Sequence, residues 1–406
     1  MFYGWWLVIA FFFIALYVGA AVFWGFTAFM EPLVKEFGWS YAQISLASSL
    51  RGLEMGLLSP IVGILVDRFG SRKLIILGVT SIGLGLIALS RTSSLITFYG
   101  AMLVLAFGAG SCTTVVLMSC TANWFQRRIG LAMGIVASGF GASGLMIPLI
   151  VYLIDAFGWR PALMLLGCGM WIIGIPLTFM IRERPQDHGL LPDGMPLGEE
   201  TSPVHSWDKE KASQPDLMQA FFSATFLSLF SVEIIRMIVA SSVGLHIMPY
   251  LGQIGFSRKY AGLVAAGVPL FSILGRFGFG WVSDSFEKHW VLVISFAAMA
   301  FGLIALCYID VGGGVILFLM LFAPGMGAGM VLRGAILRDH FRLEIFGRLI
   351  GCIVGASAIG GIIGPYLGGW LFDVLGTYRP LWFSYIGLSV LAGFLALNIR
   401  SGRQSV

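Results

Sequence analysis

Residues 48–73 read SSLRGLEMGLLSPIVGILVDRFGSRK and join an apolar stretch that carries two charges to a short basic loop. Arg51 and Glu54 lie inside a run that is apolar enough to cross a bilayer. A compact signature of glycine and charge closes the stretch: Gly63, Asp67, Arg68, Gly70, Arg72 and Lys73. A reduced copy of it, Gly280 to Asp284, returns in the later part of the sequence. A repeated unit of helix and loop therefore organises this chain.

The composition is that of a membrane protein. Hydrophobic residues make up 58% of the 406 positions and charged residues 11%, whereas soluble domains carry roughly 25% charged residues. Apolar runs of about 20 residues, the length that spans a bilayer core, recur along the whole sequence. They predict an all-α membrane protein with about twelve transmembrane helices. The first run has no basic leader and no small-residue cleavage site, so we interpret it as a helix and not as a signal peptide.

A polar, proline-rich segment divides the predicted spans into two groups. This segment, 182–217, is predicted to link an N-terminal six-helix half (1–181) to a C-terminal six-helix half (218–406). Lys and Arg residues between the spans gather mainly on the linker side, which predicts a cell membrane or inner membrane protein with both termini in the cytoplasm. The predicted spans are 5–29, 43–65, 74–90, 97–121, 129–153, 161–181, 218–247, 259–283, 289–308, 314–336, 346–372 and 381–399.

The two groups repeat each other at one constant offset, the separation of Asp67 from Asp284. The other landmarks matched at this offset are Pro32 with Pro249, Gly38-Trp39-Ser40 with Gly255-Phe256-Ser257, Gly63 with Gly280, and Pro148 with Pro365. Two halves of the same orientation, related by an axis along the membrane normal, form one of the known plans of secondary transporters. In that plan the substrate site lies between the halves, near the bilayer midplane.

The stretch from Gly63 to Lys73 resembles the loop between helices two and three of the major facilitator superfamily, and Gly280 to Asp284 resembles its counterpart in the second half. The resemblance covers the full length and implies alternating access between two six-helix halves. Three further motifs resemble the monocarboxylate transporters and the oxalate/formate antiporters of that superfamily: YGWWLV at 3–8, PLVKEFGWS at 32–40, and Gly275-Arg276-x-x-x-Gly280.

The chain departs from both groups in its membrane charges. Animal-type monocarboxylate transporters carry an Asp one turn before the Arg of helix eight, where this chain has Ser272, and a Lys in helix one, where residues 24–28 are uncharged. The oxalate/formate antiporters carry a Lys in helix eleven, and residues 349–371 hold none. Arg276 is the only one of these families' membrane charges that this chain shares.

Six ionisable residues other than histidine fall within the predicted spans: Arg51, Glu54, Glu233, Arg236, Arg276 and Arg333. Burying each charged side chain at the centre of a transmembrane helix costs at least roughly 2.5–3.5 kcal/mol, so we expect each of them to have a structural or functional role. Positive groups outnumber negative ones, which predicts an anionic substrate.

Arg276 is the predicted centre of the substrate site. It precedes Asp284 by eight residues, which places it about 12 Å inside the cytoplasmic end of its helix and close to the midplane. A guanidinium group can hold a carboxylate by two parallel hydrogen bonds, which Lys does not reproduce. The alternative is a buried structural pair with Glu54 or Glu233.

Glu233 and Arg236 share one face of a helix at depths of about 16 and 21 Å. They form either a neutralising pair, or a unit in which Arg236 binds the anion and Glu233 exchanges a proton that couples the two fluxes. Arg333 is predicted as a third anion contact. Alternatively it snorkels to the cytoplasmic surface, since Arg338 is only about 8 Å further along the helix.

Arg51 and Glu54 lie roughly 20–24 Å from the cytoplasmic end. This depth favours a structural or gating ion pair in the outer third of the membrane. Alternatively, Glu54 accepts a proton, or the pair forms an entry site for the substrate. His246 is expected to be a hydrogen-bonded polar residue at an interface, or else a pH sensor.

The resemblance also implies a cytoplasmic latch. In the superfamily, the Asp that matches Asp67 pairs with Arg residues at a neighbouring helix end and caps a helix, which closes the inner face. Here the latch would comprise Asp67, Arg68, Arg72 and Lys73 with Arg127 or Arg128 as partners, and a second latch would join Asp284 to Arg348 or Arg342. A solvated basic loop is the alternative interpretation.

The sequence holds no phosphate-binding GxxxxGK[ST] loop and no cluster with metal-ligand spacing. We therefore expect neither an enzyme nor a bound cofactor or metal, and no nucleic-acid partner. The five cysteines are expected to be small core residues. The stretch Gly360-x-x-x-Gly364-Pro365-x-x-Gly368-Gly369 is similar to the antiporter motif of drug exporters, which belongs to helix five, so we interpret it as helix packing.

Together these features predict a transporter that moves a small organic anion, first of all a monocarboxylate, together with protons across the lipid bilayer. The alternatives are anion exchange of the oxalate/formate type, transport of a drug or sugar, and a sensor without transport.

Overall fold

Helices make up the computed structural model, and eleven of those in its described residues are long and apolar enough to cross a membrane. The described residues are 2–53, 68, 70–112, 114–125, 128–182, 185, 217–309, 313–341 and 343–399.

The first half runs from residue 3 to residue 179. Its first span, Tyr3–Phe37, comprises α1 (Tyr3–Val18), a π-helical turn η1 (Gly19–Trp24) and α2 (Thr27–Phe37). The later elements are α3 (Tyr41–Leu53), α5 (Ser71–Ser90), α6 (Leu95–Ser111), α7 (Thr114–Trp124), α8 (Ile129–Ala142), η3 (Ser143–Met146), α9 (Ile147–Phe157), α10 (Trp159–Gly169), η4 (Met170–Gly174) and α11 (Ile175–Phe179).

The second half begins with the short α12 (Leu217–Phe221) and continues as six long helices. These are α13 (Ala224–Gln253), α14 (Arg258–Ser285), α15 (Lys288–Cys307), α16 (Gly314–His340), α17 (Leu343–Leu375) and α18 (Arg379–Leu397).

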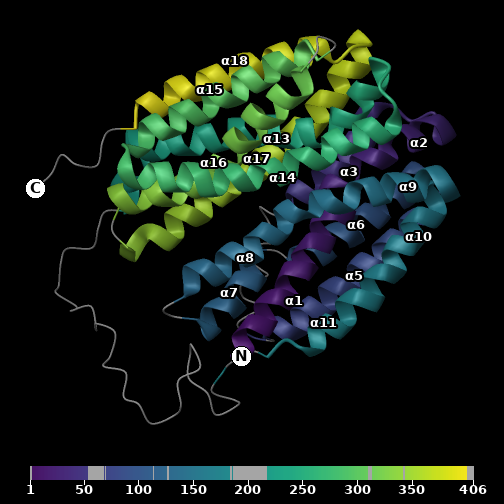
Figure 1. Ribbon diagram of the computed structural model, residues 1–406, viewed down its shortest axis with the longest axis horizontal. Helices are drawn as coiled ribbons and strands as arrows, with labels where there is room; N and C mark the ends of the chain where they lie inside the picture. Colours follow the sequence, from purple (N-terminus) through teal and green to yellow (C-terminus); the bar gives the residue numbers. More distant parts are fainter. Residues whose placement is uncertain are drawn as a thin grey trace, which may run out of the picture.

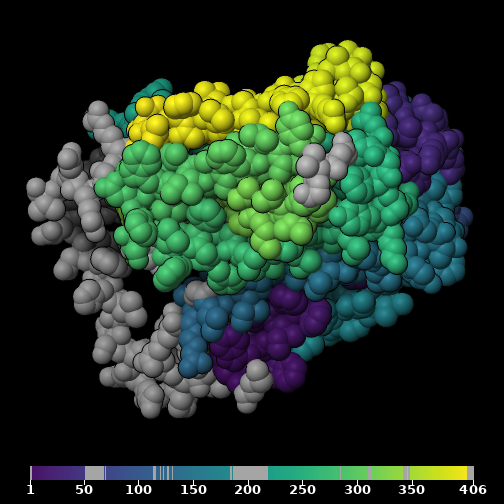
Figure 2. All heavy atoms as spheres, turned by 45° about the horizontal axis from the view of Figure 1, so that its top comes forward, coloured from purple at the N-terminus to yellow at the C-terminus, as the bar shows by residue number. Residues whose placement is uncertain are grey.

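The two halves form two side-by-side groups of roughly parallel and antiparallel helices (Figure 1). The space-filling view shows the green and yellow second half lying along the purple and blue first half (Figure 2). We call the end of the bundle at residues 37–41, 157–159, 253–258 and 375–379 the far face, which lies to the right in Figure 1. The opposite end, at residues 3, 71, 179, 224 and 288, is the terminal face.

The predicted spans coincide with the observed helices, and their ends differ by a few residues. The largest difference is in the first span, which continues to Phe37 and not to 29. Its last turns are amphipathic and include the Glu31–Lys35 ion pair at 2.6 Å, so helical hydrogen bonding continues after the apolar run ends. The predicted span 43–65 begins within α3, and its residues 54–65 lie outside the described part of the chain.

The internal repeat is visible in the backbone. Gly38 and Gly255, which are matched by the offset of the repeat, follow α2 and α13 with φ of 67° and 90°. Gly158 and Gly376, separated by nearly the same offset, follow α9 and α17 with φ of 86° and 68°. A positive φ favours glycine, which is why these landmarks recur at the matching helix ends.

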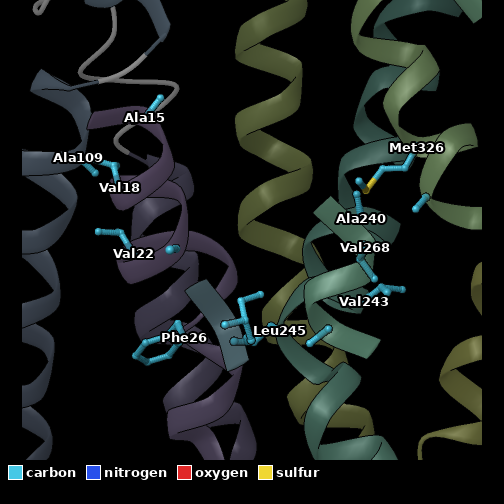
Figure 3. Packing of buried hydrophobic residues seen from close by; sticks show 14 of the residues in the cluster. Ala15, Val18, Val22, Phe26, Ala109, Ala240, Val243, Leu245, Val268 and Met326 are labelled. Atoms are coloured by element: carbon cyan, nitrogen blue, oxygen red, sulfur yellow. The ribbon is translucent and has the colours of Figure 1, made fainter. Parts of the chain in front are cut away.

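Glycines let the helices of the second half approach closely. A Cβ on Gly360 or Gly364 would lie 2.4 or 2.3 Å from the backbone oxygens of Ile234 and Ile238 on α13. The glycine stripe of α17 is therefore a packing surface, as interpreted from the sequence. Apolar side chains fill the rest of the interior, where Val22 and Phe26 of the first span and Val243 and Leu245 of α13 belong to one buried cluster (Figure 3). Three of the five cysteines are buried and the other two partly buried, all as free thiols.

Gly275 offers a direct test of this packing. Its Cβ in a Gly275→Ala variant would lie 2.0 Å from the backbone oxygen of Pro324 on α16, so the two helices must separate. We expect the free energy of unfolding to fall by about 1–3 kcal/mol, seen as a lower unfolding temperature of the detergent-purified protein. Gly278→Ala, on the same helix with nothing within 4 Å, is the matched control. Equal unfolding temperatures for both variants would contradict the close approach.

Candidate substrate site between the two halves

Arg276 lies on α14 where this helix packs against the first half. Its Nη1 donates a hydrogen bond of 2.9 Å to the backbone oxygen of Ala137 on α8. Its Nε is buried and has no hydrogen-bond partner among the described residues. Gly141 and Gly144 bring the first half close to α14, since a Cβ on Gly144 would lie 2.3 Å from the backbone oxygen of Ala266. The structure thus brings the predicted substrate residue to the seam between the halves.

A second group of charges lies within the second half, around Glu233. Arg236 donates from Nε to Oε2 of Glu233 at 2.8 Å and from Nη2 to Oε1 at 2.6 Å. Arg333 donates from Nη1 to the same Oε1 at 2.7 Å. The side chains of Glu233 and Arg236 are only 4% and 9% exposed, so this is a buried ion cluster that joins α13 to α16.

Arg333 turns into the bundle, because its guanidinium bonds Glu233 instead of reaching the terminal face. The snorkelling alternative is therefore wrong. Ser357 of α17, which the sequence analysis did not single out, completes the cluster: its hydroxyl donates to Oε1 of Glu233 and lies 3.2 Å from Nη1 of Arg333. Gly329 gives Arg236 its space, since a Cβ there would lie 2.4 Å from Cδ of Arg236.

Arg276 has no carboxylate partner among the described residues. Glu233 is engaged by Arg236 and Arg333, and no carboxylate of the described residues forms an ion pair with Arg276. The alternative pairing of Arg276 with Glu233 is thus not seen. The other candidate partner, Glu54, lies outside the described residues. The side chain of Arg51, its predicted partner, is likewise not described.

The predicted latch residues are described only in part. The guanidinium of Arg72 lies over the ring of Phe179, 5.8 Å from its centroid, and Arg68 and Arg128 are exposed at the terminal face. Asp67 and Arg127 fall outside the described residues, and nothing is described for the side chain of Asp284. Both latches remain predictions.

His246 is fully buried on α13 and is hydrogen bonded on both ring nitrogens. Nε2 lies 2.9 Å from the backbone oxygen of Pro365 and Nδ1 lies 3.1 Å from the hydroxyl of Tyr378. Since a carbonyl only accepts, Nε2 carries a hydrogen, and in the neutral ring Nδ1 then accepts from Tyr378. The expected interface residue is confirmed, and the pH-sensing role remains a prediction.

Contacts between the halves at the far face escaped the sequence analysis. Arg258, the first residue of α14, pairs with Asp155 of α9, and Asp373 of α17 accepts hydrogen bonds from the start of α3. The sequence does contain a signal for them, an Asp-x-x-Gly motif at 155–158 that recurs at 373–376.

Comparison with known proteins agrees with this architecture. The chain is 23% identical over 418 residues to monocarboxylate transporter 12-B of Danio rerio, which covers 97% of this chain and 85% of the relative. It is 26% identical over 423 residues to monocarboxylate transporter 12 of Homo sapiens, covering 98% and 81%. The solved structure of a D-xylose–proton symporter shares the fold with a TM-score of 0.78 at 16% identity, covering 100% of both chains.

The pattern that defines the Major Facilitator Superfamily matches residues 7–245 and again residues 221–405. These two matches overlap at 221–245 and together span nearly the whole chain. With the helices, the repeat and the relatives in agreement, this membrane chain belongs to the Major Facilitator Superfamily of transporters.

Proposed function

We propose that the protein is a secondary transporter that moves a small organic anion, first of all a monocarboxylate, by alternating access between its two halves. The observation that carries the proposal is Arg276, a partly buried guanidinium at the seam of the halves, whose Nε is buried without a hydrogen-bond partner and which has no carboxylate partner among the described residues. A buried charge without a counterion is costly. A bound carboxylate would supply that counterion.

The balance of charge in the middle of the spans also supports an anion. The described residues there include three guanidinium groups, those of Arg236, Arg276 and Arg333, and one carboxylate, that of Glu233. Relatives that are named monocarboxylate transporters favour a substrate with a single carboxylate.

In this proposal Arg276 is the primary contact, because it touches both halves and could exchange its bond with Ala137 for one with the substrate. Arg333, which is 17% exposed, and Arg236 would be further contacts.

Proton symport is the proposed coupling, with Glu233 as the carrier. Both of its oxygens accept hydrogen bonds from Arg236 or Arg333. An anion that takes over one of these Arg residues would leave Glu233 short of positive charge, and a proton would then restore the balance. Glu54 and Arg51 remain the second candidate pair, the latter as a gating residue.

We further propose a protein of the cell membrane in which the terminal face is cytoplasmic, the halves comprise 1–181 and 218–406, and residues 182–217 link them. The basic loops at this face support the orientation.

Uptake by proteoliposomes tests the proposal. With an acidic exterior, uptake of labelled lactate or another short monocarboxylic acid should exceed uptake without a pH difference severalfold. Uptake that requires an unlabelled anion inside the vesicles would indicate exchange instead of symport. Uptake of neutral sugars or cationic drugs, with none for a panel of organic acids, would contradict an anion site. Binding of an acid without any flux would indicate a sensor.

A further inference from the structure

At the far face, two aspartate side chains form contacts between the halves. Oδ1 of Asp155, near the end of α9, lies 2.9 Å from Nε of Arg258 in the first turn of α14. Near the end of α17, Oδ1 of Asp373 accepts from the backbone N–H of Tyr41 at 3.0 Å and Oδ2 accepts from that of Ala42 at 2.8 Å. In each case an acid at the end of one helix holds the start of a helix in the other half.

The internal repeat relates the two contacts. Asp155 and Asp373 each precede by three residues the positive-φ glycine that follows their helix, Gly158 and Gly376. The residues that the two acids contact are also matched, because Arg258 is separated from Tyr41 by the offset of the repeat. Asp155 and Asp373 therefore contact equivalent positions, at the start of equivalent helices in the opposite half. One acid meets a side-chain cation there, and the other meets the backbone N–H groups at a helix N-terminus, where negative charge is stabilised.

Each contact accompanies a tight helix pair. Beside the Asp373 contact, a Cβ on Gly369 of α17 would lie 2.6 Å from the backbone oxygen of Tyr41, and Ser49 of α3 donates to the backbone oxygen of Ile362 at 2.6 Å. Beside the Asp155 contact, a Cβ on Gly262 of α14 would lie 2.8 Å from Cγ2 of Val151 on α9. Arg258 also donates to the backbone oxygen of Ala28, and its Nη1 lies 3.8 Å from Oε2 of Glu31. Opening the far face requires both helix pairs to separate.

We propose that Asp155 and Asp373 form the two clasps of one gate at the far face, and that the clasps open together. The Asp155 clasp consists of Asp155 and Arg258, and the Asp373 clasp consists of Asp373 with the N–H groups of Tyr41 and Ala42. The gate serves the transport cycle proposed above. Its contacts and its test need no substrate, so a failed uptake experiment leaves the gate untouched.

Hydrogen exchange of the full-length protein in detergent or nanodiscs tests this coupling. Asp373→Ala removes the acceptor of the Tyr41 and Ala42 amides, so their exchange should accelerate whether or not a gate exists. The decisive variant is Asp155→Ala. If the clasps open together, it should also accelerate exchange of the Tyr41 and Ala42 amides, about 2–5-fold, as expected for loss of a partly exposed ion pair. In the double variant the two fold-changes should multiply.

Asp339→Ala is the matched control, because it removes the exposed ion pair with Lys288 at the terminal face, within one half. It should leave exchange at Tyr41 and Ala42 unchanged, and peptides from α15 should keep wild-type rates in Asp155→Ala. Wild-type exchange at Tyr41 and Ala42 in Asp155→Ala would overturn the proposal and leave two independent local contacts. Faster exchange throughout the protein would also overturn it, because that result indicates general destabilisation.

Discussion

Replacing Arg276 with Lys should lower uptake of the transported acid by about 10–100-fold, the effect of losing one hydrogen bond between charged groups of about 1.5–3 kcal/mol. Arg276 bonds Ala137 through Nη1 and leaves its Nε free, so in the proposed site one planar group would contact both the first half and the carboxylate of the substrate. A lysine keeps the charge but presents a single ammonium, and it cannot bond a carboxylate side-on through two nitrogens. The measurement is initial uptake by proteoliposomes containing equal amounts of folded protein.

Arg338→Lys is the matched control for this substitution, since Arg338 is exposed in the last turn of α16. It should transport at the wild-type rate. A thermal-shift series with short organic acids adds an equilibrium readout, because a ligand that binds only the folded state raises the unfolding temperature. The acid that stabilises the wild type should stabilise Arg276→Lys much less. Wild-type uptake and wild-type stabilisation in Arg276→Lys would remove this residue from the site.

The helices and the repeat could be predicted from sequence because they depend on local properties. Apolar length sets the spans, and the residues around Gly63 and Gly280 carry the family resemblance. Depth along a single helix was enough to nominate Arg276, since residue count fixes how far a side chain lies from the helix end. The coincidence of Gly38 with Gly255 also reflects a local requirement, a positive φ at the same helix end.

The partners of the charges could not be predicted, because they depend on which helix faces which. Depth placed Arg333 near Arg338 but said nothing of its direction, and the structure turns it onto Glu233. Ser357 gave no signal, since one hydroxyl among the small residues of α17 resembles a packing position. Asp373 lies in the last turn of α17, and only the docking of the two halves gives it the N–H group of Tyr41.

Replacing Glu233 with Gln should lower the free energy of unfolding by about 3–5 kcal/mol, the cost of removing one partner from a buried ion pair. Arg236 would then remain buried, and Arg333 partly buried, without a counterion. Arg333→Met should cost less, because it leaves Glu233 paired with Arg236. Asp339→Asn, which breaks an exposed pair, should cost under about 1 kcal/mol. Unfolding temperatures of the purified variants give this ranking, and a wild-type temperature for Glu233→Gln would contradict it.

The same variant separates the two roles of Glu233, because Gln resembles a permanently protonated carboxyl. If Glu233 only holds α13, α16 and α17 together, uptake per folded molecule should keep its dependence on the pH gradient. If Glu233 carries the coupled proton, uptake should persist but become indifferent to the gradient, since the carrier can no longer lose its proton. Uptake at matched folded protein, with and without an acidic exterior, distinguishes these outcomes. A retained gradient dependence would assign the proton to another group and leave Glu233 as the counterion of its two arginines.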